Sequence, residues 1–177
     1  MTGNDWRFCP RCAGPLALSI FKEGEEPRPA CPACGFVVYL NPRIAACTVT
    51  TLDGGLLLAR RGIDPEMGRW TLPGGFVDRG ETLEAAAVRE TFEEVKVRVS
   101  VTGILDVYSF VGHDTVVAVY AADVLSGRPE PGDETTEVRV FAPESIPWEE
   151  LAFDSTRAAL RDYLRRFFPR ARVPRMP

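Results

Sequence analysis

Three glutamates crowd the end of one predicted helix in the middle of the chain. At about 100° per residue, Glu90, Glu93 and Glu94 share an arc of roughly 100° on that helix. The arrangement is unfavourable by itself, because like charges four residues apart repel and a helix C-terminus disfavours anions. A bound divalent cation would remove both penalties, and carboxylate oxygens are ligands that Mg²⁺ or Mn²⁺ prefers. The pattern indicates a metal site or, as the alternative, a solvated acidic face.

The same helix has a second, apolar side. Val88, Phe92 and Val95 lie opposite the glutamates, and we expect them to pack against a sheet. Ala86 and Ala87 lie on the carboxylate side, where small side chains leave room for a ligand.

Two Cys-x-x-Cys pairs near the N-terminus form another candidate metal site. Cys9 and Cys12 precede Cys31 and Cys34 at a spacing typical of a four-thiolate zinc site. The alternatives are two disulfides, which a cytosolic chain disfavours, or a redox pair, which the Pro inside each pair disfavours. Four protein ligands leave no open position for water, so we expect zinc to fold a segment too small to hold a core. Cys47, in an apolar run, is predicted to be a buried strand residue without chemistry.

The glutamate-rich segment resembles the Nudix box, the signature of the Nudix hydrolase superfamily. In that pattern a Gly is followed after five residues by Glu, after seven more by Arg-Glu, and after two more by Glu-Glu. One position departs from the family, which usually has Gly where this chain has Lys96, and this departure puts the end of the helix in doubt. The matching residues here are Gly75, Glu81, Arg89, Glu90, Glu93 and Glu94.

The resemblance implies roles for these residues. In Nudix enzymes the three glutamates that match those of the helix end bind Mg²⁺, often with a backbone carbonyl at or beside the residue that matches Gly75. The metals hold the pyrophosphate of a nucleoside diphosphate linked to another group. Arg89 and Glu81 are interpreted as supports that orient the carboxylates, and the alternative is an ordinary surface ion pair.

The general base has candidates in two places. Family members take it from the box, where Glu93 is the match, or from an acidic residue in a later loop. Glu134 and Glu137 are the loop candidates in this chain. His113, the single histidine, is expected to be a loop or strand-end residue and not a catalyst.

A zinc ribbon before a Nudix domain narrows the resemblance to enzymes that act on ADP-ribose or FAD. The likeness covers the cysteine pairs and the segments 39–43, 68–82 and 138–153. NADH pyrophosphatases share this arrangement, but they have a Ser-Gln-Pro-Trp-Pro-Phe-Pro array after the box, and this chain lacks it. Two departures weaken the substrate assignment: Gly112 stands where ADP-ribose pyrophosphatases often have proline, and Ala13 follows the first cysteine pair where glycine is usual.

Residues that recognise the nucleoside are predicted from their side-chain types. Phe76, Trp70 and Tyr108 offer rings for adenine stacking, and Arg60 or Arg61 could meet a phosphate. For each of the five, the alternative is an ordinary core or surface role.

These side chains require strands on both sides of the helix. Two predicted strands within 36–62 are joined by a turn at 53–55, and a short strand near 70–72 leads into the box. Further strands are predicted at 97–110, 115–124 and 138–141, and an amphipathic helix at 154–168 with Asp154 or Ser155 as its cap.

This order of elements predicts an α+β protein with a mixed sheet flanked by helices. By resemblance it is the Nudix fold, an α/β/α sandwich, preceded by a small N-terminal zinc ribbon. We place the ribbon at 1–38 and the Nudix domain, with its C-terminal helix, at 39–177.

Composition limits the function classes. With 177 residues, 45% of them hydrophobic, the chain can hold one domain and a small appendage. No apolar run approaches the roughly 20 residues that span a bilayer, and the N-terminus lacks a signal core, so we expect a cytoplasmic protein and no membrane partner. A net charge of −4 argues against nucleic-acid binding, and the locally basic tail 167–177 is interpreted as a solvated end.

We therefore expect a Mg²⁺-dependent hydrolase that splits an adenine dinucleotide or nucleotide sugar into two monophosphates, with ADP-ribose or FAD as the first substrates to test. The alternatives are an NADH pyrophosphatase and a non-catalytic module that senses a nucleotide and docks through its ribbon. Intact carboxylates argue against the sensor. The closing helix and the strand edges could support a homodimer.

Overall fold

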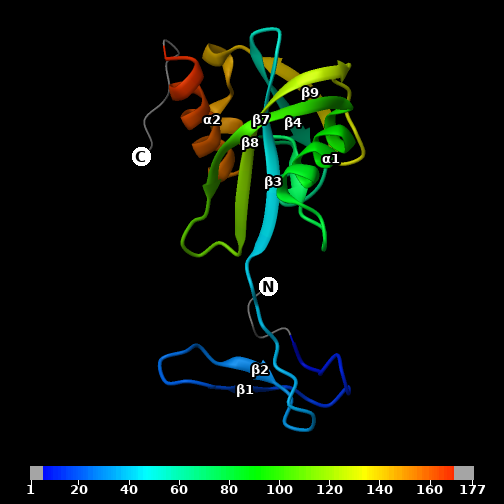
Figure 1. Cartoon of the computed structure of the whole chain (residues 1–177), viewed down its shortest axis with the longest axis vertical. Coiled ribbons are helices and arrows are strands. Elements are labelled where there is room, and N and C mark those ends of the chain that lie inside the picture. Colours follow the sequence, from blue (N-terminus) through cyan, green and yellow to red (C-terminus); the bar gives the residue numbers. More distant parts are fainter. Residues whose placement is uncertain (1–5, 170–177) are drawn as a thin grey trace. The chain divides into compact units, whose positions relative to one another are not determined.

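The computed structural model describes residues 6–169, and the chain divides into two compact units, Met1–Pro42 and Arg43–Pro177. Figure 1 shows their elements. Within the described residues, neither α-helix is long and apolar enough to span a bilayer. The predicted solvated tail lies mostly beyond the described residues.

The first unit is built from turns and one small hairpin. Strand β1 (Ala17–Ser19) pairs antiparallel with β2 (Arg28–Ala30). Each cysteine pair is followed by a residue with left-handed backbone, Ala13 with φ 57° and Gly35 with φ 72°. Glycine adopts this conformation without strain, whereas it costs alanine roughly 1 kcal/mol.

A mixed sheet of seven described strands forms the second unit. Its order is β5-β4-β3-β8-β7, with β6 also paired to β3 and β9 to β4. The strands are β3 (Arg43–Leu52), β4 (Gly55–Arg61), β5 (Trp70–Thr71), β6 (Gly74–Phe76), β7 (Val97–Tyr108), β8 (Thr115–Gly127) and β9 (Thr135–Phe141).

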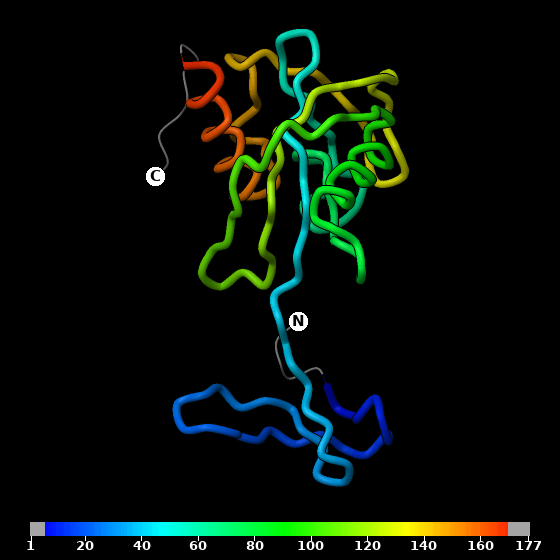
Figure 2. Tube along the Cα trace, viewed as in Figure 1, coloured from blue at the N-terminus to red at the C-terminus, as the bar shows by residue number. Residues whose placement is uncertain are grey.

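Strand β3 is the centre of this sheet. It runs parallel to β8 along most of its length, as the trace in Figure 2 also shows. It pairs with β4 only beside the hairpin turn, where Asp53 and Gly54 have φ of 51° and 78°, so the predicted turn is confirmed. Beyond the turn the two strands diverge, and β6 pairs with β3 at Ala45, Ala46 and Cys47. The gap between β3 and β4 is thus where the glycine-rich start of the box enters the sheet.

Two helices cover opposite faces of the sheet (Figure 1). On β4, Leu57 packs in the cluster that contains Val95 of α1 (Leu83–Val95), whereas Leu58 packs in the cluster that contains Leu160 of α2 (Asp154–Phe167). Alternate residues of one strand therefore serve two cores. This layering confirms the predicted fold class.

Helix α1 packs on the sheet through Val88 and Val95, as its apolar pattern predicted, but its buried side is centred on small residues and leaves Phe92 out. Ala86 and Ala87 are fully buried, whereas Phe92 is 38% exposed. Small side chains let the helix approach the sheet closely, which moves Phe92 to its margin, where the Arg98 guanidinium lies 4.7 Å from the ring centroid. The prediction for Phe92 is wrong, and the prediction for Val95, fully buried, is confirmed.

A chain of buried hydroxyls fixes α1 on β3. The Thr91 hydroxyl donates to the Ala87 carbonyl at 2.7 Å. Its single proton is thereby used, so it accepts from Thr48 at 2.8 Å, and Thr48 accepts from Thr50 at 2.9 Å. All three threonines are fully buried. Rotating the helix would leave a buried hydroxyl unpaired, which costs about 1–3 kcal/mol.

The ends of α1 are capped. Thr82 accepts the Ala85 N–H at 3.1 Å, and Lys96 takes a left-handed conformation with φ 58°. The Lys96 N–H donates to the Phe92 carbonyl at 3.0 Å, and Nζ donates to the Glu93 carbonyl at 2.9 Å. The helix therefore ends at the position where glycine is usual in the resembled pattern.

Helix α2 begins at Asp154, but its cap differs from the prediction. The N-cap is Phe153, and no side chain bonds to the first turn. Asp154 lies one position inside the helix, where its charge can still complement the helix dipole. The prediction of Asp154 or Ser155 as the cap is therefore wrong.

The left-handed lysine generates a stability prediction. Lys96→Gly removes the strain of a side chain at positive φ, whereas Lys96→Ala keeps the strain and loses the ammonium bond to the Glu93 carbonyl. We expect the Gly variant to exceed the Ala variant by about 1 kcal/mol in free energy of unfolding. Chemical denaturation followed by circular dichroism measures this, and equal stability of the two variants would contradict the strain.

Candidate functional site

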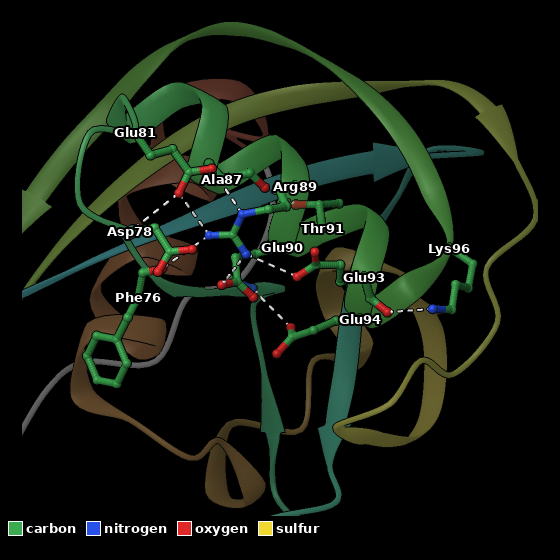
Figure 3. A network of polar contacts seen from close by, with 11 residues as sticks. Phe76, Asp78, Glu81, Ala87, Arg89, Glu90, Thr91, Glu93, Glu94 and Lys96 are labelled. Atoms are coloured by element: carbon green, nitrogen blue, oxygen red, sulfur yellow. Dashed lines mark hydrogen bonds and ion pairs between the residues drawn. The ribbon is translucent and has the colours of Figure 1, made fainter.

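Arg89 is the centre of a carboxylate network on α1 (Figure 3). Its Nε and Nη2 donate to the two oxygens of Glu81, each at 2.9 Å. Its Nη1 donates to Glu90 at 2.8 Å and to Glu93 at 3.0 Å, and Nη2 also reaches the Phe76 carbonyl at 3.3 Å. The hydrogen bonds from Arg89 hold the pKa of Glu81 below its usual value. One cation therefore orients three of the box carboxylates.

Glu94 is the buried member of the acidic group. Its side chain accepts the Gly74 N–H at 3.0 Å, and the residue is 7% exposed. Burial raises the pKa of Glu94 to about 7, although the Gly74 N–H opposes the shift, and the charges of Glu90 and Glu134 add to it. Its charge is therefore costly in this position, and a nearby cation would favour the ionised form.

The glycines of β6 allow the strand to pass between β3 and the carboxylates. A Cβ on Gly75 would lie 2.5 Å from the Glu90 carboxylate, and one on Gly74 would lie 2.5 Å from the Cys47 sulfur. Burial raises the pKa of Glu90, while the Arg89 hydrogen bond lowers it. Glu90 and Glu94 therefore lie against the backbone of β6, the strand that carries the predicted metal-binding carbonyl at Gly75.

The acidic group fits a hard divalent cation in its chemistry. Glu90 and Glu94 contact β6, and Glu93, whose side chain is 55% exposed, lies one helical turn after Arg89. Within residues 6–169, the four cysteines are the one group that places three or more metal-ligating atoms within 4.8 Å of one another. The three glutamates therefore do not yet converge on one point, and holding one cation together would require their side chains to move closer to one another.

The loop between β8 and β9 caps the C-terminal end of α1. The Gly132 N–H and the Thr135 hydroxyl both donate to the Glu94 carbonyl, each at 2.8 Å. The Glu130 N–H donates to the Val95 carbonyl at 3.1 Å. These bonds satisfy carbonyls that have no partner inside the helix. The sequence predicted a loop here, with Glu134 and Glu137 as its candidate bases, but not its contact with the helix.

The two loop carboxylates predicted as candidate bases have different surroundings. Glu134 lies between Gly132 and Thr135, which both bond to the Glu94 carbonyl at the end of α1, and its charge adds to the raised pKa values of Glu90 and Glu94. Glu137 is paired with Arg60 at 3.4 Å and also with Arg139. Both guanidinium groups lie over the ring of Trp70, and Trp70 belongs to the core on the α2 side of the sheet. The structure therefore brings Glu134 to the acidic group and leaves Glu137 apart from it.

The three aromatic residues predicted to stack on adenine differ in burial. Trp70 is 3% exposed in the core, and Tyr108 is 8% exposed with its hydroxyl donating to Asp162 at 3.1 Å. Phe76 is 48% exposed, and the Arg43 guanidinium lies 4.6 Å from its ring centroid. Of the three rings, Phe76 presents a surface to a ligand.

The two arginines at the end of β4 have different partners. The Arg61 Nε donates to the Pro65 carbonyl at 2.7 Å and its guanidinium lies 5.0 Å from the ring centroid of Phe153, while its charge lowers the pKa of Glu94. Arg60 donates to the Gly68 carbonyl at 2.7 Å and is held by Glu137. Both arginines are thus held by backbone carbonyls, and Arg61 is the one whose charge acts on Glu94.

The ring of His113 lies 5.8 Å from that of Phe110.

The four paired cysteines converge in the first unit. The sulfurs of Cys9 and Cys34 are 3.6 Å apart, and those of Cys12 and Cys31 are 3.5 Å apart. A tetrahedral zinc with bonds of about 2.3 Å requires sulfurs roughly 3.8 Å apart, whereas a disulfide requires about 2.0 Å. The cluster fits a closed metal site and not two disulfides.

Comparisons with known proteins match both units of the chain. A family model described as "NUDIX domain" matches residues 40–167, and a zinc-ribbon model described as "Nudix N-terminal" matches residues 7–40. An "ADP-ribose pyrophosphatase" of Methanocaldococcus jannaschii is 36% identical over 132 residues, which are 72% of this chain and 76% of that protein.

Two further relatives include the first unit. A "NAD-capped RNA hydrolase NudC" of Deinococcus radiodurans is 31% identical over 165 residues, 89% of this chain but only 56% of that protein. The crystal structure of a "NUDIX hydrolase" from Nitrosomonas europaea superposes with a TM-score of 0.87 at 34% identity, covering 96% of this chain and 97% of that one.

The cysteine geometry predicts one zinc ion per chain. Cys9→Ser removes one of four thiolates, so we expect zinc loss by elemental analysis and rapid proteolysis of the first unit, because a segment this small depends on its metal. Cys47→Ser, the matched control outside the cluster, should retain zinc. Zinc retained by the Cys9 variant, or lost by the Cys47 variant, would contradict the assignment.

Proposed function

The chain belongs to the Nudix family of hydrolases, and on that premise we propose that it is a Mg²⁺-dependent pyrophosphohydrolase acting on a nucleoside diphosphate linked to another group, with ADP-ribose or FAD first. The observation that carries the proposal is the contact of Glu90 and Glu94 with Gly75 and Gly74 of β6. The name of the relative in Methanocaldococcus jannaschii supports ADP-ribose as the first substrate to test.

Glu90, Glu93 and Glu94, with a backbone oxygen at Gly75, would hold Mg²⁺ or Mn²⁺. When bound, the cation supplies neutralisation of the phosphate oxygens and acidification of water. Arg89 keeps the carboxylates in position and, through its bond to the Phe76 carbonyl, also holds β6.

Glu134 is the proposed general base, because the loop that carries it is bonded to the Glu94 carbonyl whereas Glu137 is held by two arginines. A water oxygen forms the new bond to phosphorus as its proton passes to the Glu134 carboxylate. The bond from phosphorus to the bridging oxygen breaks, and two monophosphates result. Glu93, which is in the box, is the alternative base.

The remaining predicted contacts divide into ligand and structural roles. We infer that Phe76 stacks on the adenine and that Arg61 contacts a phosphate, since the Phe76 ring is exposed on the residue whose carbonyl Arg89 holds and the charge of Arg61 acts on Glu94. Trp70, Tyr108 and Arg60 support the core and the strand edge instead. Zinc in the ribbon is assigned a structural role. A cytoplasmic location and a homodimer stay predictions.

A second candidate is an NADH pyrophosphatase. The match to the NudC relative of Deinococcus radiodurans extends through the ribbon and covers 89% of this chain. The Ser-Gln-Pro-Trp-Pro-Phe-Pro array expected of NADH pyrophosphatases is absent from the sequence. NADH therefore belongs in the assay but is not the first choice.

The test is hydrolysis of a substrate panel by zinc-loaded protein with Mg²⁺. The panel contains ADP-ribose, FAD, NADH, nucleotide sugars, dinucleoside polyphosphates and nucleoside triphosphates. We expect ADP-ribose or FAD to give two monophosphates, and Glu94→Gln to lower kcat by about a thousandfold, since a cation supplies several kcal/mol. Glu84→Gln, on the exposed first turn of α1, is the matched control and should retain activity.

Two outcomes would contradict the proposal. One is unchanged turnover in the Glu94 variant, because the acidic group would then not hold the catalytic metal. The other is tight binding of one nucleotide with no turnover of any, which would indicate a sensor.

A further inference from the structure

The segment that carries Glu134 is attached to the end of the metal-binding helix. We propose that Thr135 and Gly132 are positioning residues that hold the Glu134 carboxylate beside the box glutamates, so that the base and the metal ligands move as one unit. This inference rests on the proposed role of Glu134. Thr135 and Gly132 lie outside the box, and neither is a proposed metal ligand.

The Thr135 hydroxyl has two partners that together close a small ring. It donates to the Glu94 carbonyl at 2.8 Å and accepts the Gly132 N–H at 2.9 Å. The Gly132 N–H also reaches the Glu94 carbonyl at 2.8 Å. One hydroxyl therefore joins the loop to itself and to the helix.

Gly132 is needed for this contact because of space. A Cβ at this position would lie 1.8 Å from the Glu93 carbonyl oxygen and 3.0 Å from the Glu94 Cα. Both atoms belong to the helix backbone, which cannot yield as a flexible side chain would. Any other residue would therefore push the loop away from α1.

Strand β4 holds the other side of Glu134. Gly62 directly follows that strand, and its N–H donates to the Glu134 carbonyl at 2.8 Å. The backbone of Glu134 is thus fixed between β4 and the end of α1, while its side chain stays exposed. Glu134 therefore lies between Gly132 and Thr135, which are both bonded to the Glu94 carbonyl.

Glu94 connects the loop anchor with the proposed metal site. Its carbonyl receives the loop, and its carboxylate contacts β6 and is a proposed metal ligand. A change in the loop anchor should therefore displace the base while the carboxylates keep their bonds to Arg89 and Gly74. A misplacement of about 1 Å can cost up to a hundredfold in rate.

The kinetic test compares Thr135→Val, which keeps the shape but loses the hydroxyl, with Thr135→Ser, which keeps the hydroxyl. We expect the Val variant to lose at least about tenfold in kcat, with KM and the Mg²⁺ concentration for half activity within about twofold. The Ser variant should approach wild type. Thr102→Val, which removes a hydroxyl bond of 3.1 Å to the Ala121 carbonyl, is the matched control and should leave kcat unchanged.

A double-mutant cycle decides whether Thr135 acts through Glu134. In the Glu134→Gln background, Thr135→Val should have no further effect on kcat, because the base is already lost. If the two substitutions lowered kcat by independent factors that multiply in the double variant, the proposal would be overturned. A Ser variant as slow as the Val variant, or a higher Mg²⁺ requirement in the Val variant, would overturn it too. An unchanged kcat in Glu134→Gln alone would overturn it as well.

A measurement without turnover separates this proposal from the proposed function. In wild type carrying Mn²⁺, we expect paramagnetic broadening of the Glu134 amide signal and slow hydrogen exchange at the Gly132 amide. Thr135→Val should weaken the broadening of the Glu134 signal and should speed hydrogen exchange at the Gly132 amide at least about tenfold. Thr135→Ser should change neither the broadening nor the exchange rate. Unchanged broadening and exchange in the Val variant would overturn the positioning role, whereas normal results in a protein that hydrolyses no substrate would count against the function alone.

Discussion

The close approach of α1 to β3 and β6 is the constraint on which the site depends. Ala86, Ala87 and Thr91 let the helix lie against the sheet, and the buried hydroxyl chain fixes its rotation. That rotation decides which glutamates meet the glycine strand. It buries Glu94 at a considerable electrostatic cost, since burial raises the pKa of its carboxyl to about 7. A site with this cost is suited to a cation, which favours the ionised carboxyl.

Arg89 organises the acidic group without a metal. It shares one guanidinium among Glu81, Glu90 and Glu93, so the repulsion between them is reduced before a ligand arrives. The same helix ends at Lys96, whose left-handed backbone turns the chain into β7. The carbonyls left at that end receive the β8–β9 loop. The helix thus connects the acidic group with the loop carboxylate through its own backbone.

The sequence predicted what depends on local spacing. The cysteine pairs, the box and the hairpin turn are each set by a few neighbouring residues. The side of α1 that faces the sheet was predicted wrongly at Phe92, because hydrophobicity favoured a large ring where close packing required alanine. Burial of Trp70 and Tyr108, and the separation of Glu134 from Glu137, depend on contacts between distant segments, which a single sequence does not show.

The most direct measurement is a crystal structure with Mn²⁺ and a non-hydrolysable ADP-ribose analogue, with diffraction recorded on both sides of the manganese absorption edge to distinguish manganese from zinc. The account predicts manganese bound by the carboxylates of Glu90, Glu93 and Glu94 with a backbone oxygen at Gly75, and the pyrophosphate beside it. Manganese bound elsewhere, or an analogue whose pyrophosphate lies away from these glutamates, would contradict the account.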